Sequence, residues 1–580
     1  MGPTPAGRLD PADRRHVHLP GQHAAGQARR TPRPAPQDQP ARPARDAQHG
    51  GPDGRLLAGA GRGHQEAGVV LPDHAAGDRP ALSGLRPRLW PEALRRLWRQ
   101  PGDRGPGAGR RACPALGRTA SGRHRPRRRD RHPDRSPVRR PAAGAGPGTP
   151  RGMRLAADST RMASLQDRSR AAVWHPCTQM ARLADVPPLP IARGEGPWLF
   201  DTEGHRYFDA NSSWWVNLFG HSDRALHDAI KAQLDTLPHV MLAGCTHEPA
   251  VRLAERLSAR TGGALGHACF GSDGASAVEI ALKQSFHSWK NRGQPEKREF
   301  VCLRHSYHGE TLGALSVTDV QVFRDAYDPL LMRAHIVASP DARLGNEAEA
   351  LAAMRALLAE RHAQIACVIV EPLVQGAAGM VMYSPDYLRG LRALTREFGV
   401  HLIADEIAVG CGRTGTFFAW EQVLGEAEAH RHRGPEAQRP SADAGHWPDF
   451  ILLSKGITGG TMALSLVLTT DAVFNAFWSD DVSRGFLHSH SYTGNPLACA
   501  AANAVLDRFD AGQLDANRAQ AERLARAFAP LAASSPRVTH LRQRGMILAF
   551  DVADAPPRFA EAFHLAARAH ELLIRPIGHT

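Results

Sequence analysis

The chain has 580 residues, a formal net charge of +14 and a mean hydropathy of −0.37. This length allows several domains with large buried cores. The charge does not indicate a basic protein throughout, because it is confined to the first 150 residues. These hold 29 arginines, no lysine and 12 acidic residues, for +17, whereas the remainder holds 43 basic and 46 acidic residues, for −3.

The eight cysteines form no C-x-x-C pair and show no metal-type spacing, which is typical of reduced thiols in a cytosolic protein. No apolar stretch approaches the roughly 18 residues that a membrane span needs, and the N-terminus lacks the apolar core of a signal peptide. We therefore expect a cytoplasmic protein without a membrane partner.

Residues 1–160 are predicted to be a disordered extension rich in Arg, Pro, Gly and Ala. The first 150 residues contain no Lys, Ile, Phe, Tyr or Asn, so they cannot bury enough apolar surface to offset chain entropy. One interpretation is a GC-rich stretch translated from a misplaced start, with the protein beginning near Met153 or Met162. The alternative is a basic arm for nucleic acid. The segment SGRHRPRRRDRHP has no interleaved aromatic residue to stack on bases, so we expect no nucleic-acid partner.

From Trp174 onward the pattern is that of a folded protein. The alternating residues around Asp-Thr-Glu-Gly in WLFDTEGHRYFDANSSWWVNLFGH predict a hairpin. Helical patterns follow at Ala225–Leu237 and Ala250–Thr261. Strands and helices then alternate, which predicts an α/β sheet with helices on both sides. The expected elements are Cys269–Phe270, Ala275–Lys290, Phe300–Leu303, Ala348–Arg361, Ala366–Val370, Tyr387–Phe398, Leu402–Ala404 and Phe450–Leu453.

The rest of the chain adds an insertion and a second, smaller unit. Residues 425–447 are polar and poor in apolar residues, which predicts a surface loop that holds His430 and His432. A long helix is expected after Pro496, and a last αβ-like segment from about Val538. The chain ends at Thr580 without a capping element.

Three apolar runs each end on an ionisable residue: ACVIVEP at Glu371, VHLIADE at Asp405 and FILLSKG at Lys455. Such runs suit strands buried on both faces of a parallel sheet, where ligands collect beyond the carboxyl ends of the strands. Burial would lower the pKa of Lys455 and make it a nucleophile able to form a Schiff base. Alone, an S-K-G lysine is more often a solvated loop residue. Asp405 changes this balance, because a neighbouring carboxylate can pair with the pyridinium nitrogen of pyridoxal phosphate.

Two weaker sequence motifs add candidate residues to the same site. In FGSDGASAVEIALK a strand leads through a turn into a helix, where the amides of Gly274 and Ala275 would face a phosphate. In RHSYHGET, Tyr307 could lie flat on an aromatic ring, although a single tyrosine is as often part of a core. His488 and His490 could ligate a metal, but no third ligand stands at a suitable spacing, so we expect no metal.

Trp174–Thr580 resembles the class III pyridoxal-phosphate aminotransferases of fold type I. The matching motifs are WHPCTQM, SSWWVNLFGH, YHGET, VEPLVQGAAGM, ADEIAVGCGRTG, LSKGITGGTMALS, HSYTGNPLACAAA and IRPIG, over roughly 70% of the chain. The WHP start, the Trp pair and the T-G-G-T-M run are most similar to one branch. That branch transfers an amino group from S-adenosylmethionine to 8-amino-7-oxononanoate in biotin biosynthesis, giving 7,8-diaminononanoate.

The resemblance implies a role for each matching residue. Lys455 would bind the cofactor covalently and move the proton, and Asp405 would pair with the pyridine nitrogen. Gly274 and Ala275 would hold the phosphate, together with His490 and Ser491 from the other subunit of a homodimer. The positions that fall where the family contacts substrate are Trp214, Tyr307, Lys455, Ser489, Arg575 and Cys177. Arg575 would bind the substrate carboxylate in a bidentate manner, and Trp215 is expected to be a core residue facing away from Trp214.

Some positions differ from the family pattern. Cys177 replaces a tyrosine, Ala275 a common Ser or Thr, and Glu310 a frequent Asp. The family continues beyond R-P-I-G, so we expect a small domain truncated just after Arg575. The implied division is a disordered extension (1–160), the N-terminal part of a small domain (161–220), a large cofactor-binding domain (221–480), and a connecting helix with the truncated C-terminal small domain (481–580). The alternatives are another class III ω-aminotransferase and an inactive truncated product.

Overall fold

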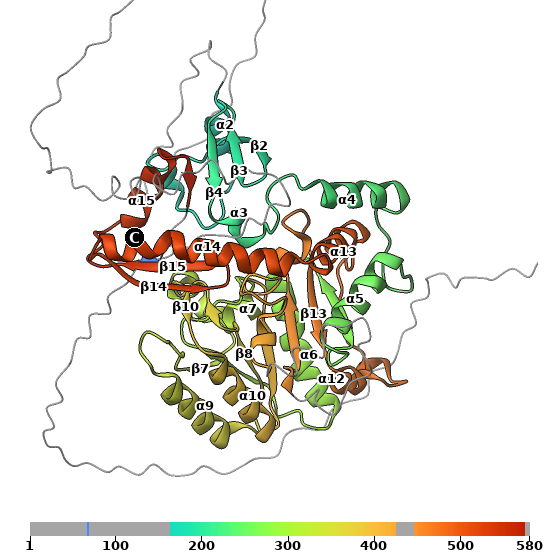
Figure 1. Ribbon diagram of the computed structural model, residues 1–580. Helices are drawn as coiled ribbons and strands as arrows, with labels where there is room; N and C mark the ends of the chain where they lie inside the picture. The colour runs from blue at the N-terminus through green and yellow to red at the C-terminus, as the bar shows by residue number, and fades with distance from the viewer. Residues whose placement is uncertain (1–66, 69–162, 425–445, 575–580) are drawn as a thin grey trace, which may run out of the picture. The chain divides into compact units, whose positions relative to one another are not determined.

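A seven-stranded sheet lies at the centre of the part of the chain that the computed structural model describes, residues 67–68, 163–424 and 446–574 (Figure 1). The chain divides into two units, residues 1–63 and 64–580, and the described residues all belong to the second. In this sheet β13 runs antiparallel to both of its neighbours, and the other pairs are parallel. The strand order is β5 (His267–Gly271), β13 (Ser465–Thr469), β12 (Phe450–Leu453), β11 (His401–Asp405), β8 (Ile365–Val370), β6 (Glu299–Leu303) and β7 (His335–Val337).

Helices cover both faces of this sheet. Along β6, Phe300 and Cys302 belong to one hydrophobic cluster, whereas Val301 and Leu303 belong to another. The first cluster contains the buried face of α6 (Gly274–Asn291). The second contains buried residues of α5 (Glu248–Arg260), α9 (Glu347–Arg361), α10 (Pro385–Glu397) and α13 (Pro496–Asp510). Because both faces are buried, the strands are apolar at nearly every position.

Two smaller sheets lie outside the central one. β4 (Arg206–Asp209), β3 (Trp198–Asp201) and β2 (Ile191–Glu195) form an antiparallel sheet, and β16 (Leu572–Leu573) joins it in parallel with β4. The two ends of the folded chain therefore share one sheet. β14 (Val538–Arg544) and β15 (Ile547–Val552) form a hairpin, and β1 (Ala67–Gly68) pairs with β15. A third hydrophobic cluster packs this hairpin against α14 (Gln513–Ser534) and α15 (Phe559–Arg568).

The expected order of helices and strands is confirmed. β3 and β4 form the predicted hairpin, and α4 (Arg224–Thr236) begins one residue before the predicted start. α14, the long orange-red helix in Figure 1, lies beside β14 and β15 but was not predicted. None of the described helices is long and apolar enough to cross a membrane.

Two predictions fall largely outside the described residues. The proposed disordered extension is described only at Ala67–Gly68. The predicted surface loop at 425–447, with His430 and His432, is described only at its end, where Trp447 is 1% exposed and packs into the core. The domain boundaries stay a prediction.

Candidate active site

Asp405 and Lys455 stand at the carboxyl ends of two adjacent parallel strands. Asp405 is the last residue of β11, and its register partner on β12 is Leu452. Lys455 follows three residues later and begins the short helix η5 (Lys455–Thr458). Because both side chains leave the sheet at the same edge, they reach the crevice that the fold leaves for ligands. The prediction that Asp405 and Lys455 stand at the ends of neighbouring strands is therefore confirmed.

Lys455 is half-buried, and its amine lies over an aromatic ring. Its Nζ lies 5.1 Å from the centroid of the Trp215 ring. Burial lowers the pKa of Lys455 from 10.5 to about 8, although the carboxylates of Asp405 and Glu371 act in the opposite direction. Near neutral pH a larger share of this amine is therefore unprotonated than of an exposed lysine. An unprotonated amine is the nucleophilic form, so this lysine suits Schiff-base chemistry.

His308 fixes the orientation of the Asp405 carboxylate. Asp405 is 4% exposed, and its Oδ2 lies 2.7 Å from His308 Nδ1. Its Oδ1 accepts a hydrogen bond of 3.1 Å from the Ile407 amide. His308, only 2% exposed, was not singled out from the sequence, although it directly follows Tyr307. The arrangement is a buried, pre-oriented acceptor for a protonated ring nitrogen.

Glu371, at the end of β8, is a second buried carboxyl at the same edge. Its Oε2 accepts a hydrogen bond from the Tyr307 amide, and its Oε1 accepts one from the Gly376 amide, both at 3.0 Å. Burial raises the pKa of Glu371 to about 7, and the nearby charge of Asp405 acts in the same direction. Glu371 therefore fixes the backbone of two loops around the crevice.

The N-terminus of α6 meets this edge, as the sequence predicted. The carboxylate of Asp273 caps the helix by accepting a hydrogen bond of 3.0 Å from the Ser276 amide. A Cβ on Gly274 would lie 3.1 Å from Cγ2 of Ile407, two residues beyond Asp405. The first turn of α6 is thus packed against the end of β11. Its N-terminal amides and helix dipole favour a phosphate there.

The Trp pair lies on a left-handed turn instead of a strand. In α3 (Ser212–Trp215) all four residues have positive φ, between 47° and 72°. Such a conformation costs about 1–2 kcal/mol for each residue, so other contacts must hold it. Arg413 donates hydrogen bonds to the carbonyls of Trp215 and Asn217 at 2.7 and 3.1 Å, and Ser213 donates one to Asp209 at 2.7 Å.

This turn corrects the expectation for Trp215. Trp214 is 51% exposed, whereas Trp215 is half-buried and its ring faces the Lys455 amine. A Cβ on Gly376 would lie 2.8 Å from the Trp215 ring, so this glycine allows the ring its place. Trp215 packs against the hydrophobic core, as predicted, but the strand alternation assumed for the Trp pair was wrong, and its ring also faces the reactive amine.

Tyr307, Glu310 and Cys177 form a polar group at the exposed side of the site. The Tyr307 hydroxyl donates a hydrogen bond of 2.9 Å to Glu310 Oε1, and the Cys177 thiol donates one of 3.6 Å to the same oxygen. Burial, together with the Glu310 charge, raises the pKa of Tyr307. The structure therefore brings together Tyr307 and Cys177, two positions that the resemblance placed near substrate, through their shared contact with Glu310.

The remaining predicted residues lie elsewhere or outside the described part. Ser489 and Ser491 are exposed, and His490 is half-buried, in the loop before α13. The described contacts of this loop are local or reach neighbours such as Lys283, whose Nζ lies 2.9 Å from His488 Nδ1. Arg575 lies outside the described residues. No group of three His, Cys, Asp or Glu side chains in the described ranges is placed to hold a metal ion.

These residues fit pyridoxal phosphate. An amine with a lowered pKa, a buried carboxylate held by a histidine, and a helix N-terminus meet at one sheet edge. With the mostly parallel α/β sheet, this is the arrangement of a pyridoxal-phosphate-dependent transferase of fold type I.

Comparisons with known proteins agree. The family "Aminotransferase class-III" matches residues 179–432 and 436–580. The adenosylmethionine-8-amino-7-oxononanoate aminotransferase of Helicobacter pylori is 40% identical over 420 residues, which is 70% of this chain and 90% of that protein. The crystal structure of the enzyme of that name from Methanocaldococcus jannaschii superposes with a TM-score of 0.65 at 32% identity, covering 72% of this chain and 92% of the other. An amine transaminase from an uncultivated Pseudomonas species, in its PLP-bound form, gives a TM-score of 0.62 at 30% identity and covers 70% and 92%.

The chain belongs to the class-III aminotransferases. It is a pyridoxal-phosphate-dependent aminotransferase, as the sequence predicted.

Proposed function

We propose that this aminotransferase transfers an amino group from S-adenosylmethionine to 8-amino-7-oxononanoate in biotin biosynthesis. Amination of the ketone at C7 gives 7,8-diaminononanoate. The observation that supports this most directly is the 40% identity, over 90% of its length, to a relative named for these two substrates. The described cysteines are all free thiols, which suits work in the reducing cytoplasm.

Each residue at the sheet edge has a different proposed role in the reaction. Pyridoxal phosphate, when bound, supplies an electron-withdrawing ring that carries the amino group between the two substrates. Lys455 holds the cofactor and its amine moves a proton at the substrate carbon. Asp405, oriented by His308, holds the proton on the ring nitrogen. The amides of Gly274 and Ala275 bind the phosphate, and Tyr307 flanks the ring.

Both substrates carry positive charge and an aliphatic part, which suits the exposed side of the site. The half-exposed ring of Trp214 offers an apolar face and a partner for a sulfonium cation. Glu310, which accepts hydrogen bonds from Tyr307 and Cys177, offers a carboxylate for an ammonium group. Ser489 and Arg575 complete the proposed substrate site, with Arg575 binding the carboxylate.

The amino donor distinguishes the proposed reaction from that of a general ω-transaminase. We expect the purified holoenzyme to lose its visible cofactor band on addition of S-adenosylmethionine, and 8-amino-7-oxononanoate to restore it. A spectral change with simple diamines alone would favour the ω-transaminase. No change with any amine, in protein that holds the cofactor, would favour the inactive product.

We further propose a homodimer in which His490 and Ser491 complete the phosphate site of the partner. In support, Ser491 is exposed, and large apolar side chains nearby, such as Leu487 and Tyr492, are more than 60% exposed. Light scattering should give twice the chain mass, and Ser491→Glu should weaken cofactor retention by about tenfold through charge repulsion with the phosphate. A monomer that retains the cofactor would contradict the proposal.

A further inference from the structure

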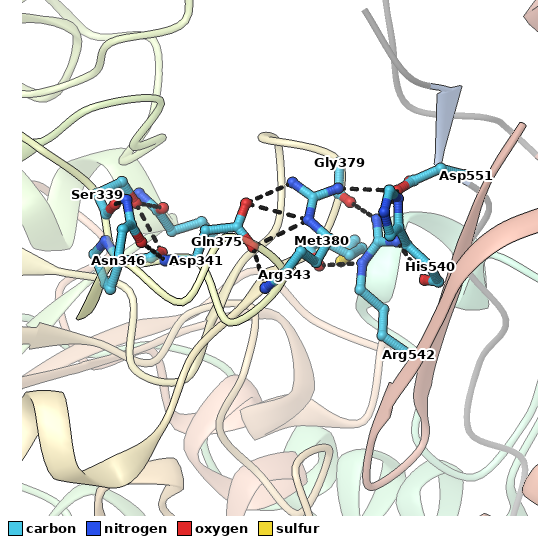
Figure 2. A network of polar contacts seen from close by, with 11 residues as sticks. Ser339, Asp341, Arg343, Asn346, Gln375, Gly379, Met380, His540, Arg542 and Asp551 are labelled. Atoms are coloured by element: carbon cyan, nitrogen blue, oxygen red, sulfur yellow. Dashed lines mark hydrogen bonds and ion pairs between the residues drawn. The ribbon is translucent and has the colours of Figure 1, made fainter. Parts of the chain in front are cut away.

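An ion-pair network centred on the buried Asp551 joins the β14–β15 hairpin to the loops of the central sheet (Figure 2). Asp551, on β15, is 1% exposed. Its Oδ2 lies 2.9 Å from Arg343 Nη1 and 3.0 Å from His540 Nδ1, and its Oδ1 lies 2.8 Å from Arg542 Nη2. Arg343 also pairs with Asp341 at 2.7 Å. Two carboxylates thus balance two guanidinium groups, so the buried charge of Asp551 is paired.

Arg542 links this network to one particular turn. Its Nε donates a hydrogen bond of 2.8 Å to the carbonyl of Met380, and its Nη2 donates to the carbonyl of Gly379. Figure 2 shows Arg542 between these two residues and Asp551. The side chain of Arg542 is only 9% exposed. Desolvated, charge-assisted bonds of this kind are among the stronger hydrogen bonds in proteins.

The turn that Arg542 holds leads directly to the active site. It lies between β9 (Val374–Gln375) and β10 (Val381–Met382), and the Met380 amide closes it on the Gly376 carbonyl at 3.1 Å. The Gly376 amide donates to Glu371, and its Cα packs against the ring of Trp215. That ring in turn lies over Lys455.

We propose that Arg542 is a positioning residue of the active site. By binding the 376–380 turn from the β14–β15 hairpin, it fixes Trp215 and Glu371 beside the reactive lysine, so that the placement of the hairpin and the geometry of the site are coupled. Arg542 itself is separated from Lys455 by the turn, Gly376 and Trp215. The inference rests on Lys455 being the reactive amine, as the proposed function requires.

The test uses the full-length holoenzyme and the variants Arg542→Met and Arg542→Lys. Hydrogen exchange in the peptide 374–382 reports the turn, and the pH midpoint of the visible cofactor band reports the surroundings of Lys455. With Arg542→Met we expect exchange at least about tenfold faster, a midpoint shifted by about one pH unit, and a kcat about ten- to a hundredfold lower, because small misplacements are costly in catalysis. Arg542→Lys, which keeps the charge and one donor, should fall between.

Arg537→Met is the matched control. Arg537 lies just before β14 and also donates to backbone carbonyls, but these belong to Ala553 and Asp554, just after β15. The Arg537→Met substitution should leave hydrogen exchange at 374–382 and the pH midpoint of the visible cofactor band unchanged. Unchanged exchange in Arg542→Met, or faster exchange with an unchanged midpoint and kcat, would overturn the proposal. If Arg542→Met does not fold, hydrogen exchange at 374–382, the pH midpoint and kcat are measured on Arg542→Lys, and the same outcomes support or overturn the proposal. Exchange and absorbance need no substrate, so they stay informative if S-adenosylmethionine is not the donor.

Discussion

Replacing Lys455 by alanine is expected to lower aminotransferase turnover by at least about 10³-fold, because the variant loses both the nucleophile and the proton carrier. The cofactor would then be held only by non-covalent contacts. The visible band of the covalently bound cofactor should disappear, and the cofactor should be lost on gel filtration. Steady-state rates and an absorbance spectrum of the purified variant measure both effects.

Lys297 offers a matched control for this substitution. Burial lowers its pKa to about 8, as it does for Lys455. However, its Nζ donates to the carbonyls of His362, Ile365 and Gly399 at 2.6, 3.3 and 3.0 Å, so it is a structural cation. Lys297→Met should leave these carbonyls without their donor and cost roughly 1–3 kcal/mol of stability, with the cofactor band retained. A Lys455→Ala variant that still transaminates would refute the assignment of the reactive lysine.

The strand ends could be predicted because their signal is local. In HLIAD the three residues before the acidic end are apolar, and a strand buried on both faces is the element that suits such a run. The same holds for FILL before Lys455. Once two such strands are adjacent and parallel, their polar ends must meet. The order of strands and helices in the sequence was therefore enough to predict most of the fold and the neighbouring amine and carboxylate of the site.

The residues that were missed depend on contacts between distant segments. His308 lies 97 positions from Asp405, and the YHGET motif contains no local signal that the His308 ring contacts that carboxylate. The left-handed turn at Ser212–Trp215 is held by Arg413, about 200 positions later, against the local preference of serine and tryptophan. Strand alternation was the natural local interpretation, and tertiary contacts override it. Arg542 was missed for the same reason, because its carbonyl partners lie 162 and 163 positions away.

Replacing Asp405 by asparagine should have the second largest effect, and it acts on two groups. Turnover should fall by about 10²–10³-fold, because the ring nitrogen loses the anion that keeps it protonated. In the cofactor-free protein the Asp405 charge raises the pKa of Lys455, so its removal should lower that pKa below about 8. The sign is informative, because a general loosening of the site would hydrate the amine and move its pKa up. The pH dependence of reductive methylation at Lys455, followed by mass spectrometry, measures the shift.

Asp449 provides the comparison, because it is a carboxylate that precedes β12 at the opposite end of these strands. It accepts hydrogen bonds of 2.8 Å from Arg392 and from the Leu402 amide. Asp449→Asn should therefore reduce stability without moving the methylation midpoint of Lys455. If Asp405→Asn left that midpoint in place or raised it, Asp405 would not act on the amine through its charge. The two strand ends would then be neighbours without being one site, and the pairing of acid and amine that explains the choice of cofactor would be lost.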